Sequence, residues 1–205
     1  MISGKKAVYY ICNDERRQGL VSRIVWDILK EKGCMVPAGI VFDGRDVMVH
    51  KDERDNKYYF VPTEVPVCWD YPRYLPEMNG KFADCDIAGM VTWHEGASAP
   101  PKVLTVHSIG DVNSGVYGPT NPLYMRNLLH AMERNRGALG LEEYQTATEA
   151  THWSGTHVTG SSPQLILQYP VPMVDIEVGS EKESWSDRAA CKALADALTQ
   201  VFDSD

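Results

Sequence analysis

Short apolar segments of strand-like composition alternate along this chain with segments of helical periodicity, and this order narrows the possible folds most. Residues 6–12 (KAVYYIC) are apolar and rich in β-branched and aromatic side chains, which predicts a buried first strand. A polar loop follows. From Leu20 to Lys32 the apolar residues recur at helical spacing, until Gly33, a residue type that often ends helices. A strand followed by a loop and a helix is a common opening of an α/β fold.

The remainder of the chain continues this alternation. Further strands are expected over residues 38–42, 46–50, 57–62, 87–93, 102–108, 144–152 and 173–179. The second and third of these strands face each other across a polar turn, which predicts a hairpin. A helix is expected from Leu123 to Asn135, with Asn121 as its N-cap and Pro122 in its first turn.

Two further segments complete the prediction of secondary structure. Four prolines between residues 62 and 76 predict an extended surface segment. Ser180 and Glu183 suit a capping box at the start of one last helix, whose apolar face runs to Val201. We therefore predict a single α/β domain over residues 1–205, with three layers and a mixed, mostly parallel sheet flanked by helices.

Composition and charge limit the class of protein. The 205 residues are 43% hydrophobic and 23% charged, with a formal net charge of −8. This acidic balance argues against broad binding to DNA or other nucleic acids, which depends on Lys and Arg. No stretch approaches the roughly 20 apolar residues of a membrane helix. The five cysteines are odd in number and scattered, which favours reduced thiols and a cytoplasmic location.

Histidines follow or end three of the predicted strands. They are His94, next to Glu95, then His107, next to Ser108, and finally His152, with His157 five residues later. In open α/β sheets, ligands bind beyond the carboxyl ends of the strands, so these groups can meet in space. Imidazoles with a carboxylate serve as zinc ligands or acid–base pairs. Taken singly, each histidine is more typical of a structural or surface residue; taken together, they indicate a shared site.

Two acidic residues lie in the strand predicted over residues 173–179. Alternation places Asp175 and Glu177 on one face of this strand. A carboxylate on an interior strand is costly unless it is paired or functional. The alternative interpretation is an edge strand with one face in water.

The glycines and serines suggest two weaker interpretations. Gly110, Gly115 and Gly118 precede a predicted helix, whose N-terminus suits an anion such as a phosphate, although glycine-rich connections also serve simply as flexible loops. Ser22, Ser108 and Ser154 are conceivable nucleophiles, but the GxSxG pattern of serine hydrolases is absent from the sequence.

Four segments, taken together and in this order, resemble a known family. They are residues 105–111 (TVHSIGD), 122–135 (PLYMRNLLHAMERN), 148–155 (TEATHWSG) and 175–190 (DIEVGSEKESWSDRAA). They are similar to the patterns TVHxxGN, P-x-x-M-K-x-L, E-x-THHGP and EIGSTEEEW of D-aminoacyl-tRNA deacylases of the archaeal and plant type. The resemblance covers about the second half of the chain. It implies an α/β fold similar to that of purine nucleoside phosphorylases and peptidyl-tRNA hydrolases.

The resemblance also implies a function and a set of site residues. Members of this family are metal-associated hydrolases that cleave the ester between a D-amino acid and the 3′ end of tRNA. By position in the motifs, together with the strand-end pattern, we expect three roles. The catalytic residues would be His107, His152 and Glu177; the substrate-binding residues Ser108, Gly110, Thr151 and Ser180; and the ligands of a zinc ion His94, His107, His152, His157 and Glu177.

The chain also departs from the family patterns. The second histidine of THHGP is Trp153 here, the following pair is Ser154 and Gly155, and the asparagine of TVHxxGN is Asp111. Family members continue well beyond the helix that begins at Trp185. Two functions are therefore carried forward. One is hydrolysis of D-aminoacyl-tRNA by metal- or histidine-activated water. The alternative is a catalytically altered or inactive relative that binds a nucleotide or an amino-acid-like ligand.

Overall fold

The computed structural model describes residues 4–12, 20–96, 98–153 and 158–203, with only the backbone of residues 150–153. Its strands are β1 (Lys6–Cys12), β2 (Val36–Phe42), β3 (Arg45–Lys51), β4 (Lys57–Thr63), β5 (Ile87–Trp93), β6 (Val103–Asp111), β7 (Val116–Tyr117), β8 (Gln145–Trp153) and β9 (Met173–Val178). Its helices are α1 (Leu20–Glu31), α2 (Tyr71–Phe82), α3 (Pro122–Ala138), α4 (Lys182–Trp185) and α5 (Arg188–Leu198), with two 3-10 helices, η2 (Val67–Trp69) and η3 (Pro163–Gln168).

The nine strands in the described ranges belong to one sheet. Its order is β2-β3-β4-β1-β5-β9-β6-β7, and β8 pairs with β6. The central strands β4, β1, β5 and β9 run parallel, whereas β6 runs antiparallel to β9 and parallel to β8. At the other end, β2, β3 and β4 form an antiparallel meander that includes the predicted hairpin. The mixed sheet flanked by helices that the sequence predicts is confirmed.

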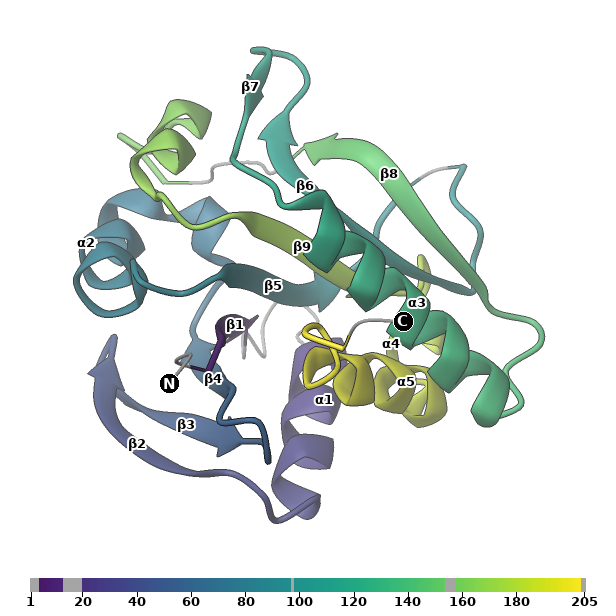
Figure 1. Cartoon of the computed structure of the whole chain (residues 1–205). Coiled ribbons are helices and arrows are strands. Elements are labelled where there is room, and N and C mark those ends of the chain that lie inside the picture. The colour runs from purple at the N-terminus through teal and green to yellow at the C-terminus, as the bar shows by residue number, and fades with distance from the viewer. Residues whose placement is uncertain (1–3, 13–19, 97, 154–157, 204–205) are drawn as a thin grey trace.

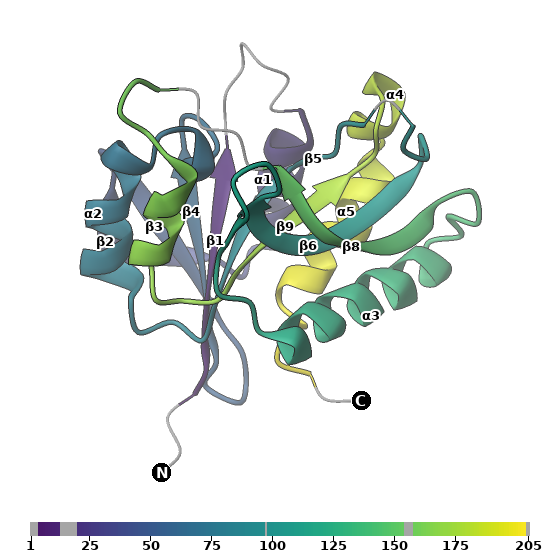
Figure 2. The same cartoon turned by 90° about the horizontal axis from the view of Figure 1, so that it is seen from above.

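Helices cover both faces of the sheet and create two apolar layers. In Figure 1, α2 lies to the left of the sheet, whereas α1, α3 and α5 lie to the right; Figure 2 shows the same separation from above. One core cluster joins the sheet to α1, α3 and α5 and includes Val91, Val106 and Ile176. The other joins the opposite face to α2 and η3 and includes Ala88 and Met90. Neighbouring residues of β5 thus enter different layers, as strand alternation requires.

The proline-rich segment is where the sequence-based prediction of an extended excursion is wrong. The helix α2 begins there, with the Asp70 side chain accepting a hydrogen bond from the Arg73 backbone N–H and with a proline in the first turn. Pro76 lies inside the helix and forgoes one backbone hydrogen bond. Burial of Tyr71 and Tyr74 against the sheet outweighs that loss. Tertiary packing here overrides the local proline signal.

The predicted capping box and single last helix are also wrong. The short helix α4 has Glu181 as its N-cap, with no side-chain hydrogen bond at the cap. The chain turns after Trp185, and a separate helix, α5, begins beyond Asp187, whose side chain accepts from the N–H groups of Ala189 and Ala190. None of the helices in the described ranges has the length and apolar character that spanning a bilayer requires.

Candidate functional site

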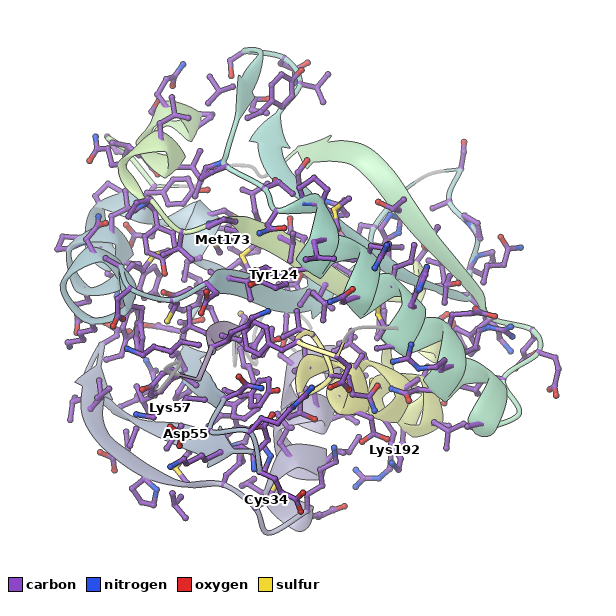
Figure 3. The ribbon with its side chains drawn as sticks, viewed as in Figure 1. Cys34, Asp55, Lys57, Tyr124, Met173 and Lys192 are labelled. Atoms are coloured by element: carbon purple, nitrogen blue, oxygen red, sulfur yellow. The ribbon has the colours of Figure 1, made fainter. Side chains whose placement is uncertain are left out.

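Polar side chains gather on the sheet face opposite α1, α3 and α5, across β5, β9, β6 and β8. Residues that pair directly across neighbouring strands point to the same face. Glu177 pairs with Thr92 on one side and with Thr105 on the other, and His107 pairs with Asp175 and with Glu149. The strand β9, which begins at Met173 (Figure 3), lies between β5 and β6 in the sheet. Its two acidic residues therefore have a strand on each side. The edge-strand interpretation of this segment is therefore wrong.

His107 is the centre of a buried acidic group. Its Nε2 lies 3.1 Å from Oε2 of Glu177, and its Nδ1 lies 3.9 Å from Oδ2 of Asp175. Nδ1 also donates a hydrogen bond to the backbone carbonyl of Ser108 at 3.1 Å. All three charged side chains are at least 94% buried. Buried charges of this kind are costly to leave unpaired, so the group is held together by mutual pairing.

The acidic neighbours change the protonation of His107. Burial favours the neutral imidazole, but the hydrogen bond to Glu177 and the charges of Asp175 and Glu177 outweigh it and raise the pKa of His107 to about 9. Both ring nitrogens face acceptors, which is consistent with a doubly protonated ring at neutral pH. One imidazolium between two carboxylates leaves the group with a net negative charge that suits a cation.

The donor set of this group fits a metal ion. One ligand atom each from His107, Asp175 and Glu177 lie within 4.8 Å of one another. Ligands around a tetrahedral zinc ion lie roughly 3.4 Å apart, so small side-chain shifts would bring these atoms to coordination distance. The bond from Nδ1 of His107 to the Ser108 carbonyl is the kind of outer contact that orients metal-ligating histidines.

Two threonine hydroxyls flank the acidic group. Thr92 donates a hydrogen bond from Oγ1 to Oε1 of Glu177 at 3.0 Å, which fixes the orientation of that carboxylate. The hydroxyl of Thr105 is buried and has no hydrogen-bond partner among the described residues. A buried hydroxyl without a partner costs about 1–3 kcal/mol, so this oxygen favours a ligand, water or ion that would contact it.

A second group lies at the end of β5, around His94. Nδ1 of His94 lies 2.8 Å from Oγ of Ser180, and Nε2 lies 3.1 Å from Oε1 of Glu149. The indole N–H of Trp185 donates to the backbone carbonyl of His94 at 3.1 Å. The His94 side chain is 3% exposed, and that of Glu149 is 36% exposed. The two groups adjoin, since Glu149 is also the cross-strand neighbour of His107.

Gly179 sets the position of Ser180. It follows the last residue of β9 and has a φ of +69°, a conformation that L side chains rarely adopt. A Cβ atom on Gly179 would lie 2.3 Å from Cβ of Ser184. The close approach to Ser184 and the left-handed turn both require glycine here, and the turn carries Ser180 toward His94.

The structure brings together four of the sequence-predicted site residues. His107 and Glu177 are in direct contact, and His94 contacts Ser180. His94 is not among the described residues that could jointly hold a metal ion; Asp175 is. Sequence reasoning placed Asp175 on the correct strand face but assigned it no role, and the alternation that linked it to Glu177 was the available signal.

The other predicted site residues are placed differently. The side chains of Thr151 and His152, and all of His157, lie outside the described residues; the backbone of His152 pairs with that of Ile109. Ser108 contributes its backbone carbonyl, while alternation along β6 directs its side chain away from His107.

The predicted glycine loop is a β-hairpin. Gly110 pairs with Tyr117 across β6 and β7, and Gly115 occupies the turn with a φ of +67°. Asp111, which stands at the asparagine of the family pattern, accepts hydrogen bonds from the Asn113 backbone and from the Ser114 hydroxyl. Its carboxylate therefore stabilises the hairpin turn.

Comparison with known proteins gives a consistent result. Residues 81–205 match the family model for D-aminoacyl-tRNA deacylase. A D-aminoacyl-tRNA deacylase from Methanospirillum hungatei is 33% identical over 138 residues, covering 65% of this chain and 29% of the relative. One from Methanocorpusculum labreanum is 31% identical over 129 residues, covering 60% and 26%. One from Archaeoglobus fulgidus is 22% identical over 168 residues, covering 78% and 55%. The chain thus spans about a quarter to a half of these relatives.

Solved structures resemble the whole fold. The crystal structure of a conserved protein of unknown function has a TM-score of 0.66 at 18% identity, covering 98% of this chain and 64% of that one. The futalosine hydrolase of Helicobacter pylori, in mutant form, has a TM-score of 0.60 at 8% identity, covering 98% and 99%. At these identities the likeness concerns the fold alone, and it agrees with the α/β architecture that the sequence predicts.

Proposed function

Because the chain belongs to the D-aminoacyl-tRNA deacylase family, we propose that it hydrolyses the ester between a D-amino acid and the 3′ end of tRNA. Water is the final acceptor of the aminoacyl group. The observation that carries the proposal is the buried group of His107, Asp175 and Glu177, which stands beside the His94 group on one face of the sheet. Ester hydrolysis requires proton transfer and stabilisation of negative charge on the carbonyl oxygen, and these groups offer both.

We propose zinc as the cofactor of this site. His107, Asp175 and Glu177 would hold the ion, which would supply a Lewis acid for the ester carbonyl and for water. The Ser108 carbonyl would keep Nδ1 of His107 protonated and leave Nε2 as the ligand atom. Thr92 would orient the Glu177 carboxylate through its hydrogen bond. The Thr105 hydroxyl would contact the bound substrate or water.

The charge of the chain bears on how tRNA would bind. A net charge of −8 does not favour extended contact with the phosphate backbone. We propose that this chain contacts mainly the 3′-terminal nucleotide and its aminoacyl group. Binding should then depend on salt less steeply than it does for proteins that neutralise many phosphates.

The experiment that tests the proposal compares D- and L-aminoacyl-tRNA carrying the same amino acid, with the full chain in excess. We expect the D-ester to be hydrolysed faster than the L-ester and faster than in buffer alone. A chelator should slow the reaction, and added zinc should restore it. Binding of the D-substrate without turnover, or equal rates for both esters, would contradict the proposal.

A further inference from the structure

The hydrogen bonds of His94 define a direction for proton transfer. In the 3.1 Å contact between His94 and Glu149, the carboxylate oxygen accepts and Nε2 of the ring donates. In the tautomer that carries its hydrogen on Nε2, Nδ1 offers a lone pair, and the serine hydroxyl donates to it across the 2.8 Å contact. Serine donates to histidine, and histidine donates to glutamate. This is the polarity of an activated nucleophile, its base and the group that orients the base.

The surroundings of Ser180 support a reactive role. The His94 ring is buried, and its backbone carbonyl is held by the Trp185 indole, so the base has a fixed position. Ser180 itself is only partly buried. It follows the strand β9 through the left-handed turn at Gly179, which places a hydroxyl at the end of a central strand. A partly exposed hydroxyl beside a fixed base is the geometry that nucleophilic catalysis requires.

We propose that Ser180 is a nucleophile that takes the acyl group from the ester, with His94 as its base and Glu149 as the positioning residue. Oγ of Ser180 bonds to the acyl carbon while its proton passes to Nδ1 of His94. The bond from the acyl carbon to the 3′ oxygen then breaks, and His94 returns the proton to that oxygen. Water next attacks the acyl-serine and gives a proton to His94, which restores the Ser180 hydroxyl and releases the acid.

This inference rests on the proposed function for its natural substrate, but the reactivity of Ser180 can be measured without tRNA. The probe is diisopropyl fluorophosphate, which phosphorylates activated serines, and the readout is the mass of the intact chain followed by peptide mapping. We expect one adduct, on Ser180. Labelling should disappear in Ser180→Ala, which removes the nucleophile. It should slow at least tenfold in His94→Asn and in Glu149→Gln, since each removes one of the two residues that, with Ser180, form the proposed serine relay.

A matched control is available in the same segment. The hydroxyl of Ser186 bonds to backbone carbonyls of its own turn, Lys182 and Glu183, so Ser186→Ala should label at the wild-type rate. Circular dichroism of each variant checks folding. If Ser180→Ala fails to fold, Ser180→Cys replaces it and should give a covalent adduct with a D-amino acid thioester at residue 180.

The possible results separate the two proposals. Labelling of Ser180 without hydrolysis of D-aminoacyl-tRNA would support the serine relay and overturn the proposed function. Hydrolysis of D-aminoacyl-tRNA that persists in folded Ser180→Ala, with no label on the wild-type serine, would overturn the serine relay and leave the proposed function standing. Labelling of Ser180 that is unchanged in His94→Asn would also overturn it, because the hydroxyl would then need no base.

Discussion

At the scale of single residues, the position of His107 between two carboxylates decides what the site can bind. A metal ion needs the neutral ring, whereas the metal-free group favours the imidazolium, with a pKa of about 9. Protons and a metal ion therefore compete for the same nitrogen. Cys68 lies close enough for the charges of Asp175 and Glu177 to act on it, and burial, together with those charges, raises the pKa of its thiol. We therefore expect Cys68 to remain a thiol.

The competition at His107 predicts how zinc affinity depends on pH. Below pH 9 the ring must lose a proton when zinc binds, so the apparent affinity should rise about tenfold per pH unit up to about pH 9. For a histidine of ordinary pKa, about 6.5, the rise would end near neutrality. Competition with a chelator at several pH values measures the slope. An affinity that is constant above pH 7 would contradict the raised pKa or the ligand role of His107.

Removal of one carboxylate tests the ligand set at the same scale. Asp175→Asn keeps the size of the side chain but removes its charge, so zinc affinity should fall by at least about tenfold, the lower end of the losses seen even for outer-shell partners. Asp196→Asn is the control, because Asp196 pairs with Lys32 and Lys192 on the opposite side of the sheet. Equal zinc affinity in both variants would remove Asp175 from the site.

At the scale of elements, the end of β9 is the segment on which the His94 group depends. Gly179 combines a left-handed conformation with a close approach to Ser184, whereas Gly115 has nearly the same φ in open space. The two glycines therefore separate the conformational cost of a side chain from its steric cost. The predicted capping box is wrong because the Ser180 side chain is directed toward His94 and not toward the first turn of α4.

Substitution of these glycines gives a stability prediction. Gly179→Ala should lower the free energy of unfolding by about 2–5 kcal/mol, the sum of a left-handed non-glycine residue and an overpacked contact. Gly115→Ala should cost only about 1–2 kcal/mol. Urea unfolding of both variants measures the difference. Equal losses would mean that Ser184 can move away from the added side chain at little cost.

The elements differ in whether the local sequence predicts them. The strand of residues 6–12 is predicted correctly from its apolar, β-branched and aromatic composition, and the helix from Leu20 is predicted correctly from its helical periodicity. The helix α2 could not be predicted in this way, because its stability comes from burial of Tyr71 and Tyr74 against a distant strand face. Proline signals describe the local chain and not the packing that overrides them.

At the scale of the whole molecule, the strand order creates the site. Insertion of β9 between β5 and β6 places the acidic residues of a late segment beside His107, which lies much earlier in the chain. Alternation predicted that Asp175 and Glu177 share a face, and strand ends predicted that the histidines converge. Neither pattern contains the order of the strands, so the direct contacts of His107 with Glu177, and of His94 with Glu149, could not be derived.

The most direct test of the proposed function asks whether ester hydrolysis takes place at the buried group of His107, Asp175 and Glu177. The measurement is the single-turnover rate of D-aminoacyl-tRNA hydrolysis by the wild-type chain, by Glu177→Gln and by the distal control Asp196→Asn. Glu177→Gln keeps the shape of the side chain but removes its charge, and the rate should fall by at least about 100-fold. Asp196→Asn should hydrolyse at the wild-type rate. A folded Glu177→Gln variant with wild-type activity would contradict the assignment of this site.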